Sequence, residues 1–174
     1  MEEGKGSGSL MEIRNIPYSD IPQILEIYAQ GVESGRSTFT RTVPSVEEWD
    51  KGHHPFARVG AYEGDLLIGW AALSPTSSRP HYSGVAEVSL YIRDGYRAGG
   101  VGTALLKAEM GEGEKNGIWT FYGHIFSSNK ASIRMCEKAG WRLVGTREKI
   151  ARDAFGVWQD TTIMEYRSKT VGID

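Results

Sequence analysis

The chain has 174 residues, enough for one domain with a substantial hydrophobic core and too few for two domains of ordinary size. Lys and Arg together number 20 and Asp and Glu 22, which leaves a formal net charge of −2, so the composition favours neither nucleic acid nor an anionic membrane as a partner. No apolar run approaches the ~20 residues that span a bilayer, and the amino end lacks the apolar core of a signal peptide. We therefore expect a soluble, cytoplasmic protein.

Cysteine and histidine give no sign of a structural metal or a disulfide. Cys136 is the single cysteine, and no second Cys or His lies near it at metal-finger spacing. His53 and His54 are adjacent, and neighbouring side chains diverge on a helix or a strand. We interpret the pair as a surface turn and expect no metal cofactor.

The two ends of the chain differ in composition from the rest. Residues 1–10 combine Gly, Ser, Lys and Glu, which predicts a disordered leader or a remnant of cloning. We expect a single domain over residues 11–168, followed by a short tail over residues 169–174.

The folded part begins with a predicted strand and helix. Apolar and polar residues alternate over residues 11–16, which predicts a strand. Ser19 or Asp20 then precedes apolar residues at helical spacing, with Pro22 tolerated in the first turn. This helix is expected to end before a polar loop over residues 31–44.

A short helix and a hairpin are predicted next. Ser45-Val-Glu-Glu48 has the form of a capping box and predicts a short helix that carries Trp49. Strand-like runs over residues 57–63 and 66–73 flank Gly64-Asp65. Such a short turn predicts an antiparallel hairpin.

The centre of the chain predicts a loop, a strand, a glycine-rich turn and a helix. A polar loop over residues 74–83 leads into Glu87-Val-Ser-Leu-Tyr-Ile92, a β-branched and aromatic run. Arg97-Ala-Gly-Gly-Val-Gly-Thr103 follows, and residues 103–110 have helical composition. The unpaired amides and positive dipole end of a helix start favour a phosphate group.

This glycine-rich turn matches neither of the two common nucleotide loops. A Walker A loop would place a lysine between Gly102 and Thr103, and a dinucleotide fingerprint would place a glycine at Leu105. From the residues alone, the turn is either a phosphate-binding loop or an ordinary connection without a ligand.

The last part of the chain predicts a strand, a helix and two strands. Residues 118–125 form a strand-like run, and Ser127, Ser128 or Asn129 can cap a helix over residues 130–139. Strands over residues 141–145 and 157–166 follow, joined by an irregular segment. The whole order predicts an α/β fold of mixed, α+β-like character, with helices on both faces of a mixed sheet.

Two sequence blocks resemble those of one enzyme family. Arg97-Ala-Gly-Gly100-Val-Gly102 matches Arg/Gln-x-x-Gly-x-Gly/Ala, the marker of the GCN5-related N-acetyltransferase (GNAT) superfamily. Asn129-Lys-Ala-Ser132, leading to Glu137-Lys-Ala-Gly-Trp141, is similar to its Asn-x-x-Ser and Glu-Lys-x-Gly-Phe block. Three shorter motifs resemble the phosphinothricin acetyltransferase-like branch: Ser37-Thr-Phe39, Glu87-x-Ser-x-Tyr-Ile92 and Phe155-Gly-Val-Trp158-Gln-Asp160.

The resemblance covers residues 12–166 and implies the GNAT fold, with a mostly antiparallel central sheet of about seven strands. It also implies that acetyl-CoA donates an acetyl group to a primary amine. Loop amides would hold its pyrophosphate, and a splayed central strand would pair with pantetheine and polarise the thioester through Leu90. The residues implied for the donor are Leu90, Tyr91, Ile92, Arg97, Ala98, Gly99, Gly100, Val101, Gly102, Thr103, Asn129 and Ser132.

The chemistry needs a base, because an ammonium group is not a nucleophile. Glu87 is our candidate, acting directly or through water, with burial in a sheet cleft expected to strengthen the base. A strand carboxylate paired with a neighbouring cation is the other interpretation. Cys136 stands where the superfamily often carries a tyrosine and the branch a histidine. Its thiol would either protonate the leaving thiolate or serve as a small buried side chain.

The resemblance implies an α-amino acid or an analogue, of the phosphinothricin or methionine sulfoximine type, as acceptor. The implied acceptor-binding residues are Phe39, Arg79, Tyr82 and Trp158. Arg79 would clamp a carboxylate or remain a solvated loop residue. The branch also implies a homodimer. The alternatives are an acetyltransferase for a polyamine, an aminoglycoside or a protein amino terminus, and a sensor that binds acetyl-CoA without catalysis.

Overall fold

The computed structural model describes residues 10–174, so the predicted leader lies almost wholly outside the described residues. The elements in chain order are β1 (Glu12–Asn15), the 3-10 turn η1 (Tyr18–Asp20), α1 (Ile21–Ser34), α2 (Val46–Gly52), β2 (Val59–Glu63), β3 (Leu66–Pro75), the 3-10 turn η2 (Pro80–Tyr82), β4 (Val85–Ile92), α3 (Val101–Lys115), β5 (Thr120–Phe126), α4 (Lys130–Lys138), β6 (Arg142–Arg152) and β7 (Trp158–Arg167).

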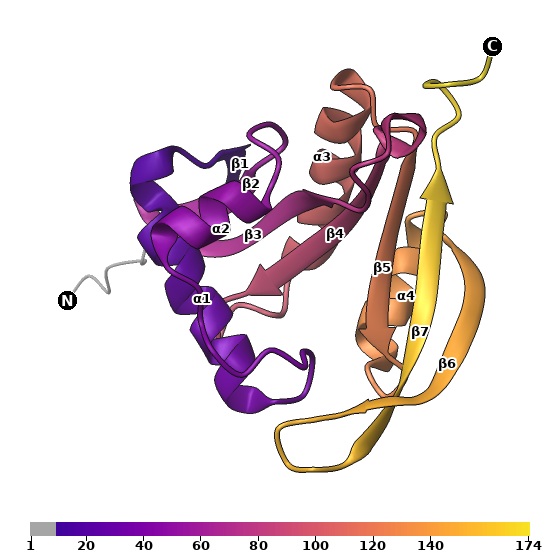
Figure 1. Ribbon diagram of the computed structural model, residues 1–174. Coiled ribbons are helices and arrows are strands. Elements are labelled where there is room, and N and C mark those ends of the chain that lie inside the picture. Colours follow the sequence, from indigo (N-terminus) through magenta and orange to yellow (C-terminus); the bar gives the residue numbers. More distant parts are fainter. Residues whose placement is uncertain (1–9) are drawn as a thin grey trace.

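The strands form one seven-stranded sheet in the order β1-β2-β3-β4-β5-β7-β6. Every neighbouring pair is antiparallel except β4 and β5, which run parallel. Helices α1 and α2 cover one face of the sheet, and α3 and α4 cover the other (Figure 1). The predicted mixed, mostly antiparallel sheet with helices on both faces is therefore confirmed.

The parallel pair is short and then opens. Strands β4 and β5 pair only at Val85 with Thr120, Ala86 with Phe121, and Glu87 with Tyr122. Beyond this point the two strands diverge (Figure 1). Strand β4 remains paired with β3 as far as Ile92, and β5 remains paired with β7 as far as Phe126. The divergence therefore divides one sheet into two stable arms joined at a fork.

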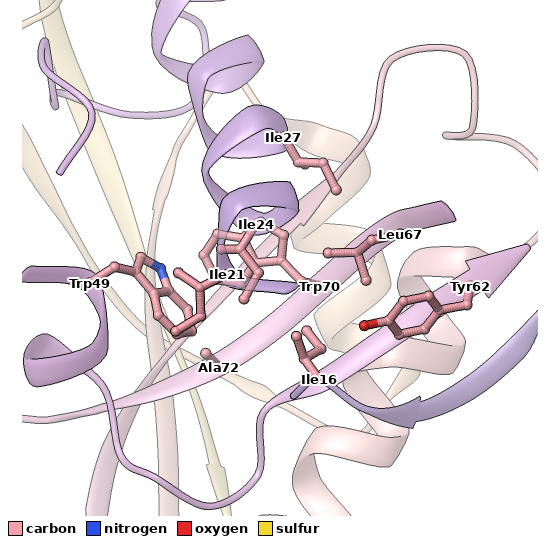
Figure 2. Packing of buried hydrophobic residues seen from close by; sticks show 9 residues of the cluster. All are labelled: Ile16, Ile21, Ile24, Ile27, Trp49, Tyr62, Leu67, Trp70 and Ala72. Atoms are coloured by element: carbon pink, nitrogen blue, oxygen red, sulfur yellow. The ribbon is translucent and has the colours of Figure 1, made fainter. Parts of the chain in front are cut away.

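Helix α1 anchors the first arm. Its buried residues Ile21, Ile24 and Ile27 follow helical spacing and pack toward Trp70 and Leu67 of β3 (Figure 2). Each of the three isoleucines is at most 1% exposed, and full burial of such a side chain contributes roughly 1.5–3 kcal/mol. This packing fixes the helix against the strand that supports β4.

Two caps were correctly predicted and one was not. Ser45 Oγ accepts a hydrogen bond from Glu48 N at 3.2 Å, and Asn129 Oδ1 accepts one from Ser132 N at 3.3 Å. Asp20 precedes α1 without a side-chain cap bond. Its carboxylate accepts a hydrogen bond from the Tyr62 hydroxyl at 2.7 Å instead, so a contact between distant segments replaces the local cap.

Two predicted boundaries were wrong. Helix α1 continues through Gly31 to Ser34 and ends at Gly35, whose φ of 62° suits glycine. Gly31 is a packing residue, because a Cβ there would lie 2.8 Å from the Tyr91 ring. Strand β6 continues to Arg152, where an irregular segment was expected, since shifts of register let it stay paired with β7.

Candidate active site

A cavity of about 450 Å³ lies at the fork between β4 and β5. Side chains alternate along β4, so Glu87 and Tyr91 face α1 while Leu90 faces α3. Tyr91 packs on Tyr28 of α1, and Leu90 packs in the cluster that contains Leu106 of α3. All five residues line the cavity. The cavity is therefore walled by elements from both faces of the sheet.

Aromatic rings form the wall on the α1 side. The Tyr91 ring stacks on Trp70, with 5.2 Å between centroids, and meets the edge of Tyr28 at 5.1 Å. Trp49 packs against Trp70 at 5.6 Å. Burial raises the pKa of Tyr91 to about 12, so its hydroxyl stays neutral at physiological pH. This wall offers a rigid, largely uncharged surface to a ligand.

Glu87 lies at the vertex of the fork, as the last β4 residue paired with β5. Its Oε2 accepts a hydrogen bond from the Tyr122 hydroxyl at 3.5 Å, and its Oε1 lies 3.7 Å from Nδ1 of His124. Burial, followed by the charge of Glu87, raises the pKa of Tyr122. The Glu87 side chain is 39% exposed, so the burial in a sheet cleft that the sequence predicted is only partial.

Cys136 belongs to the wall on the α4 side. It is 5% exposed, and burial, followed by the charge of Glu137, raises the pKa of its thiol to about 11. An ordinary thiol has a pKa of ~8.5. Transfer of a proton from the Cys136 thiol to the leaving CoA thiolate would therefore be uphill. The environment of Cys136 favours the interpretation as a small buried side chain.

The glycine-rich turn leads into α3. Gly99 and Gly100 have φ of 85° and 78°, and a Cβ at either would meet open space. Ala104 N donates to Gly100 O at 3.1 Å, which opens the helical pattern. The amides of residues 101–103 precede that bond, as the first amides of a helix do. The turn is exposed and left-handed, so its backbone is open to a ligand.

Helix α3 begins close to α4, which carries the second predicted motif. A Cβ at Gly102 would lie 2.8 Å from Sδ of Met135, so only glycine allows this approach without a shift. Asn129 and Ser132, joined by their cap bond, line the cavity beside Met135. The glycine-rich turn and the Asn-x-x-Ser block are thus brought to neighbouring positions by helix packing.

The fork gathers part of the predicted site. The predicted residues that line the cavity are Phe39, Glu87, Leu90, Tyr91, Asn129, Ser132 and Cys136. The predicted residues that do not line it are Arg79, Tyr82, Ile92, Arg97, Ala98, Gly99, Gly100, Val101, Gly102, Thr103 and Trp158.

The predicted residues outside the cavity fall into two groups. Residues 97–103 form the exposed turn and the first turn of α3. Ile92 packs in a hydrophobic cluster with Val101 and Leu105 of α3. Arg79, Tyr82 and Trp158 lie on the surface, with Tyr82 46% and Trp158 49% exposed. The Arg152 guanidinium lies over the Trp158 ring at 4.8 Å. These three residues do not converge on the cavity within one chain.

Tyr122 and His124 were missed by the sequence reasoning. Both line up on one face of β5 with Phe126, while Phe121 and Ile125 pack on the opposite face. That alternation is visible over residues 120–126, but the pairing that brings β5 to Glu87 is not. The signal was a polar residue on alternate positions of an otherwise apolar strand.

Residues 10–174 contain no cluster of three or more His, Cys, Asp and Glu side chains arranged to hold a metal ion. Within the same range, no helix is both long enough and apolar enough to cross a membrane.

A family model described as "Acetyltransferase (GNAT) family" matches residues 21–141, which include the fork, the glycine-rich turn and α4. The chain belongs to the GNAT acetyltransferase family. Membership confirms the resemblance carried by the two sequence blocks, and the family's enzymes are N-acetyltransferases that use acetyl-CoA.

Three GNAT relatives illustrate the range of similarity. An L-methionine sulfoximine/L-methionine sulfone acetyltransferase from Pseudomonas paraeruginosa is 27% identical over 160 residues, which cover 88% of this chain and 92% of the relative. A phosphinothricin acetyltransferase from Sinorhizobium meliloti, solved with acetyl-CoA, has a TM-score of 0.80 and 26% identity over 94% of this chain and 96% of its own. A ribosomal-protein-alanine N-acetyltransferase from Brucella melitensis has a TM-score of 0.83 and 25% identity over 90% and 99%.

Proposed function

We propose that this GNAT protein transfers the acetyl group of acetyl-CoA to the primary amine of a small molecule, within a single catalytic domain over residues 11–168. The fork between β4 and β5 carries the proposal, because one cavity there adjoins an unpaired strand edge, a carboxylate and an open glycine-rich turn. A GNAT relative solved with acetyl-CoA shares the fold at a TM-score of 0.80.

The residues present fit acetyl-CoA as donor. Left-handed Gly99 and Gly100 leave the backbone of the turn open, and the positive end of α3 lies behind it, which suits a pyrophosphate. Asn129 and Ser132 would line the path of the pantetheine arm. Bound acetyl-CoA supplies the thioester whose carbonyl carbon is attacked.

The edge of β4 beyond Glu87 provides backbone groups for this donor. Residues 88–92 have no β5 partner, so alternate residues direct their N–H and C=O groups into the fork. An amide there, proposed at Leu90, would donate to the thioester oxygen as charge develops. One such donor is worth roughly 3–4 kcal/mol of transition-state stabilisation.

Glu87 supplies the negative charge at the site. Within residues 10–174, it is the only carboxylate that lines the cavity, and no Lys or Arg of that range lines it. A carboxylate at this position attracts an ammonium group and can accept its proton, directly or through water, before attack. Pairing of Glu87 with a Lys or Arg, the other sequence interpretation, has no counterpart among the ion pairs of residues 10–174.

The first acceptors to test are α-amino acids and analogues of the phosphinothricin or methionine sulfoximine type. Two relatives bear such names, and Phe39 of the loop between α1 and α2 lines the cavity. No described residue that lines the cavity is Lys or Arg, so none of them offers a permanent cation to a carboxylate. Arg79, which is exposed in the loop before β4 and does not line the cavity, stays only a prediction as the group that binds the acceptor carboxylate.

The protein is proposed to act as a cytoplasmic homodimer without nucleic-acid or membrane partners. The β6–β7 region exposes large apolar residues, with Leu143 58%, Phe155 71% and Val157 54% exposed. A second copy would cover them, as apolar surface of this kind favours association. Measuring the molar mass by light scattering tests this, and a monomer at enzyme-assay and higher concentrations would refute it.

The proposed reaction is tested by following CoA thiol release. The purified protein is mixed with acetyl-CoA and, separately, methionine sulfoximine, phosphinothricin, amino acids, polyamines and aminoglycosides. Acetylation of the amino-acid group is the expected result. Tight binding of acetyl-CoA without CoA release for any amine would refute the transfer reaction and support a sensor instead.

A further inference from the structure

The vertex of the fork holds a second proton-carrying group. The two carboxylate oxygens of Glu87 face different rings of β5: Oε2 faces the hydroxyl of Tyr122 at 3.5 Å, and Oε1 faces Nδ1 of His124 at 3.7 Å. The imidazole and the phenol ring lie edge to face, with 5.2 Å between centroids. Strand β5, which diverges from β4 beyond Glu87, thus places two titratable side chains beside the Glu87 carboxylate.

His124 also faces the side of the cavity assigned to the acceptor. It shares a face of β5 with Phe126. The centroid of the Phe126 ring lies 4.6 Å from that of Phe39, in the loop between α1 and α2. Both His124 and Phe39 line the cavity. The His124 side chain is 33% exposed, so its imidazole is reachable from the cavity.

We propose that His124 is a catalytic residue that takes the proton from the acceptor ammonium, while Glu87 holds and orients its imidazole. The proposal rests on the proposed N-acetyltransferase function and names the base of that reaction. It changes the role of Glu87 from the direct proton acceptor to a positioning residue.

The chemistry of the two groups favours this division. An imidazole is in general a stronger base toward an ammonium than a carboxylate is. When Nδ1 carries its hydrogen toward Glu87, the lone pair of Nε2 is free for the substrate. The 3.7 Å separation is long for a hydrogen bond, and such contacts often shorten when substrate binds.

The step is balanced as follows. The acceptor R–NH₃⁺ gives one proton to Nε2 of His124, and the imidazolium formed is stabilised by the Glu87 carboxylate. The freed lone pair forms the N–C bond to the thioester carbonyl carbon, and the C–S bond then breaks with its electron pair on sulfur. A second N–H proton passes to the thiolate, which gives CoA–SH and the amide. The imidazolium finally releases its proton to water.

Other charged or titratable groups face this pair from the packed elements. Tyr122 and Tyr91 face Glu87 from β5 and β4, and both are neutral phenols at physiological pH because their pKa values are raised, chiefly by burial. The positive charge of Arg147 in β6 acts in the opposite direction and lowers the pKa of Tyr122. Glu87 is therefore the group that stabilises a positively charged His124 imidazolium.

The test compares the wild-type protein with His124→Gln, using an amine that the wild-type protein acetylates. We expect kcat to fall by about 10²–10⁴-fold, with the Kd for acetyl-CoA unchanged. In the wild type, turnover should decrease with falling pH once the catalytic base becomes protonated. This acidic limb should be lost in His124→Gln. His81→Gln, which removes an exposed imidazole outside the cavity, serves as the matched control.

A second variant separates chemistry from folding. His124→Ala should regain part of its activity when free imidazole is added, which a purely structural role would not produce. If the wild type is active and His124→Gln keeps full turnover and an unchanged pH profile, this inference is overturned while the proposed function stands. An inactive His124→Ala that imidazole does not rescue would also overturn the inference. A wild type that releases no CoA with any amine would refute the proposed function and this inference with it.

Discussion

Replacing Glu109 of α3 should stabilise the protein, and the gain should grow with pH. Glu109 is 0% exposed, and neither of its carboxylate oxygens has a hydrogen-bond partner among the described residues. Burial, followed by the charge of Glu112, raises its pKa well above the ordinary value. The group is thus held in the protonated form over a wider pH range than in the unfolded chain.

The magnitude follows from the unpartnered atoms. A buried polar group without a partner costs roughly 1–3 kcal/mol even when neutral, and an unpaired buried charge costs more. Glu109→Met keeps the length of the side chain and removes its polar atoms. We expect it to raise the free energy of unfolding by about 1–3 kcal/mol at low pH, or roughly 2–4 °C in Tm for each kcal/mol.

The pH dependence has a definite sign. Because the folded-state pKa is raised, the protonated carboxyl destabilises least below the unfolded-state pKa of ~4.3, and stability is lost as pH rises toward the folded-state value. The difference between Glu109→Gln and wild type should therefore widen from acidic to alkaline pH. Urea unfolding of the wild type and of Glu109→Gln at pH 5 and pH 8 measures this difference in the free energy of unfolding. A difference that stays constant with pH, or a Glu109→Met protein less stable than wild type, would refute the reasoning.

Two further predictions concern the glycine-rich turn and the α4 wall of the cavity. Gly100→Ala places a Cβ on a residue with φ of 78°, which costs about 1–2 kcal/mol, and it should weaken acetyl-CoA binding as measured by calorimetry. Unchanged affinity would place the pyrophosphate elsewhere. Cys136→Ala should keep most of the turnover, because the raised pKa of the thiol makes it a poor proton donor; loss of activity with intact acetyl-CoA binding would restore Cys136 as the acid.

Local features of the sequence predicted the elements well. Ser45 and Asn129 marked helix starts, and Gly64-Asp65 joined the predicted hairpin strands. These features act over a few residues, so composition and spacing are sufficient to find them. The glycine-rich turn after β4 was found for the same reason, since its glycines and the helix that follows are contiguous.

Contacts between distant segments explain what was missed. Gly31 looked like a helix end, but it is needed for the approach of the Tyr91 ring. His124 could be placed on one face of its strand from the local alternation, but only the short parallel pairing of β4 with β5 brings it to Glu87. Trp158 belongs to a branch-like motif and Arg79 was implied only by its place in the loop before β4, yet the surface positions of both depend on how the loops leave the sheet. Tertiary packing determines each of these outcomes.

Glu87→Gln tests the central claim most directly. The substitution keeps the size of the side chain and removes the charge at the vertex of the fork, whether that charge acts on the ammonium or on His124. Steady-state CoA release with an accepted amine should fall by about 10²–10⁴-fold, while the Kd for acetyl-CoA stays the same. Wild-type turnover in Glu87→Gln would contradict the account, since the fork would then catalyse acetyl transfer without its carboxylate.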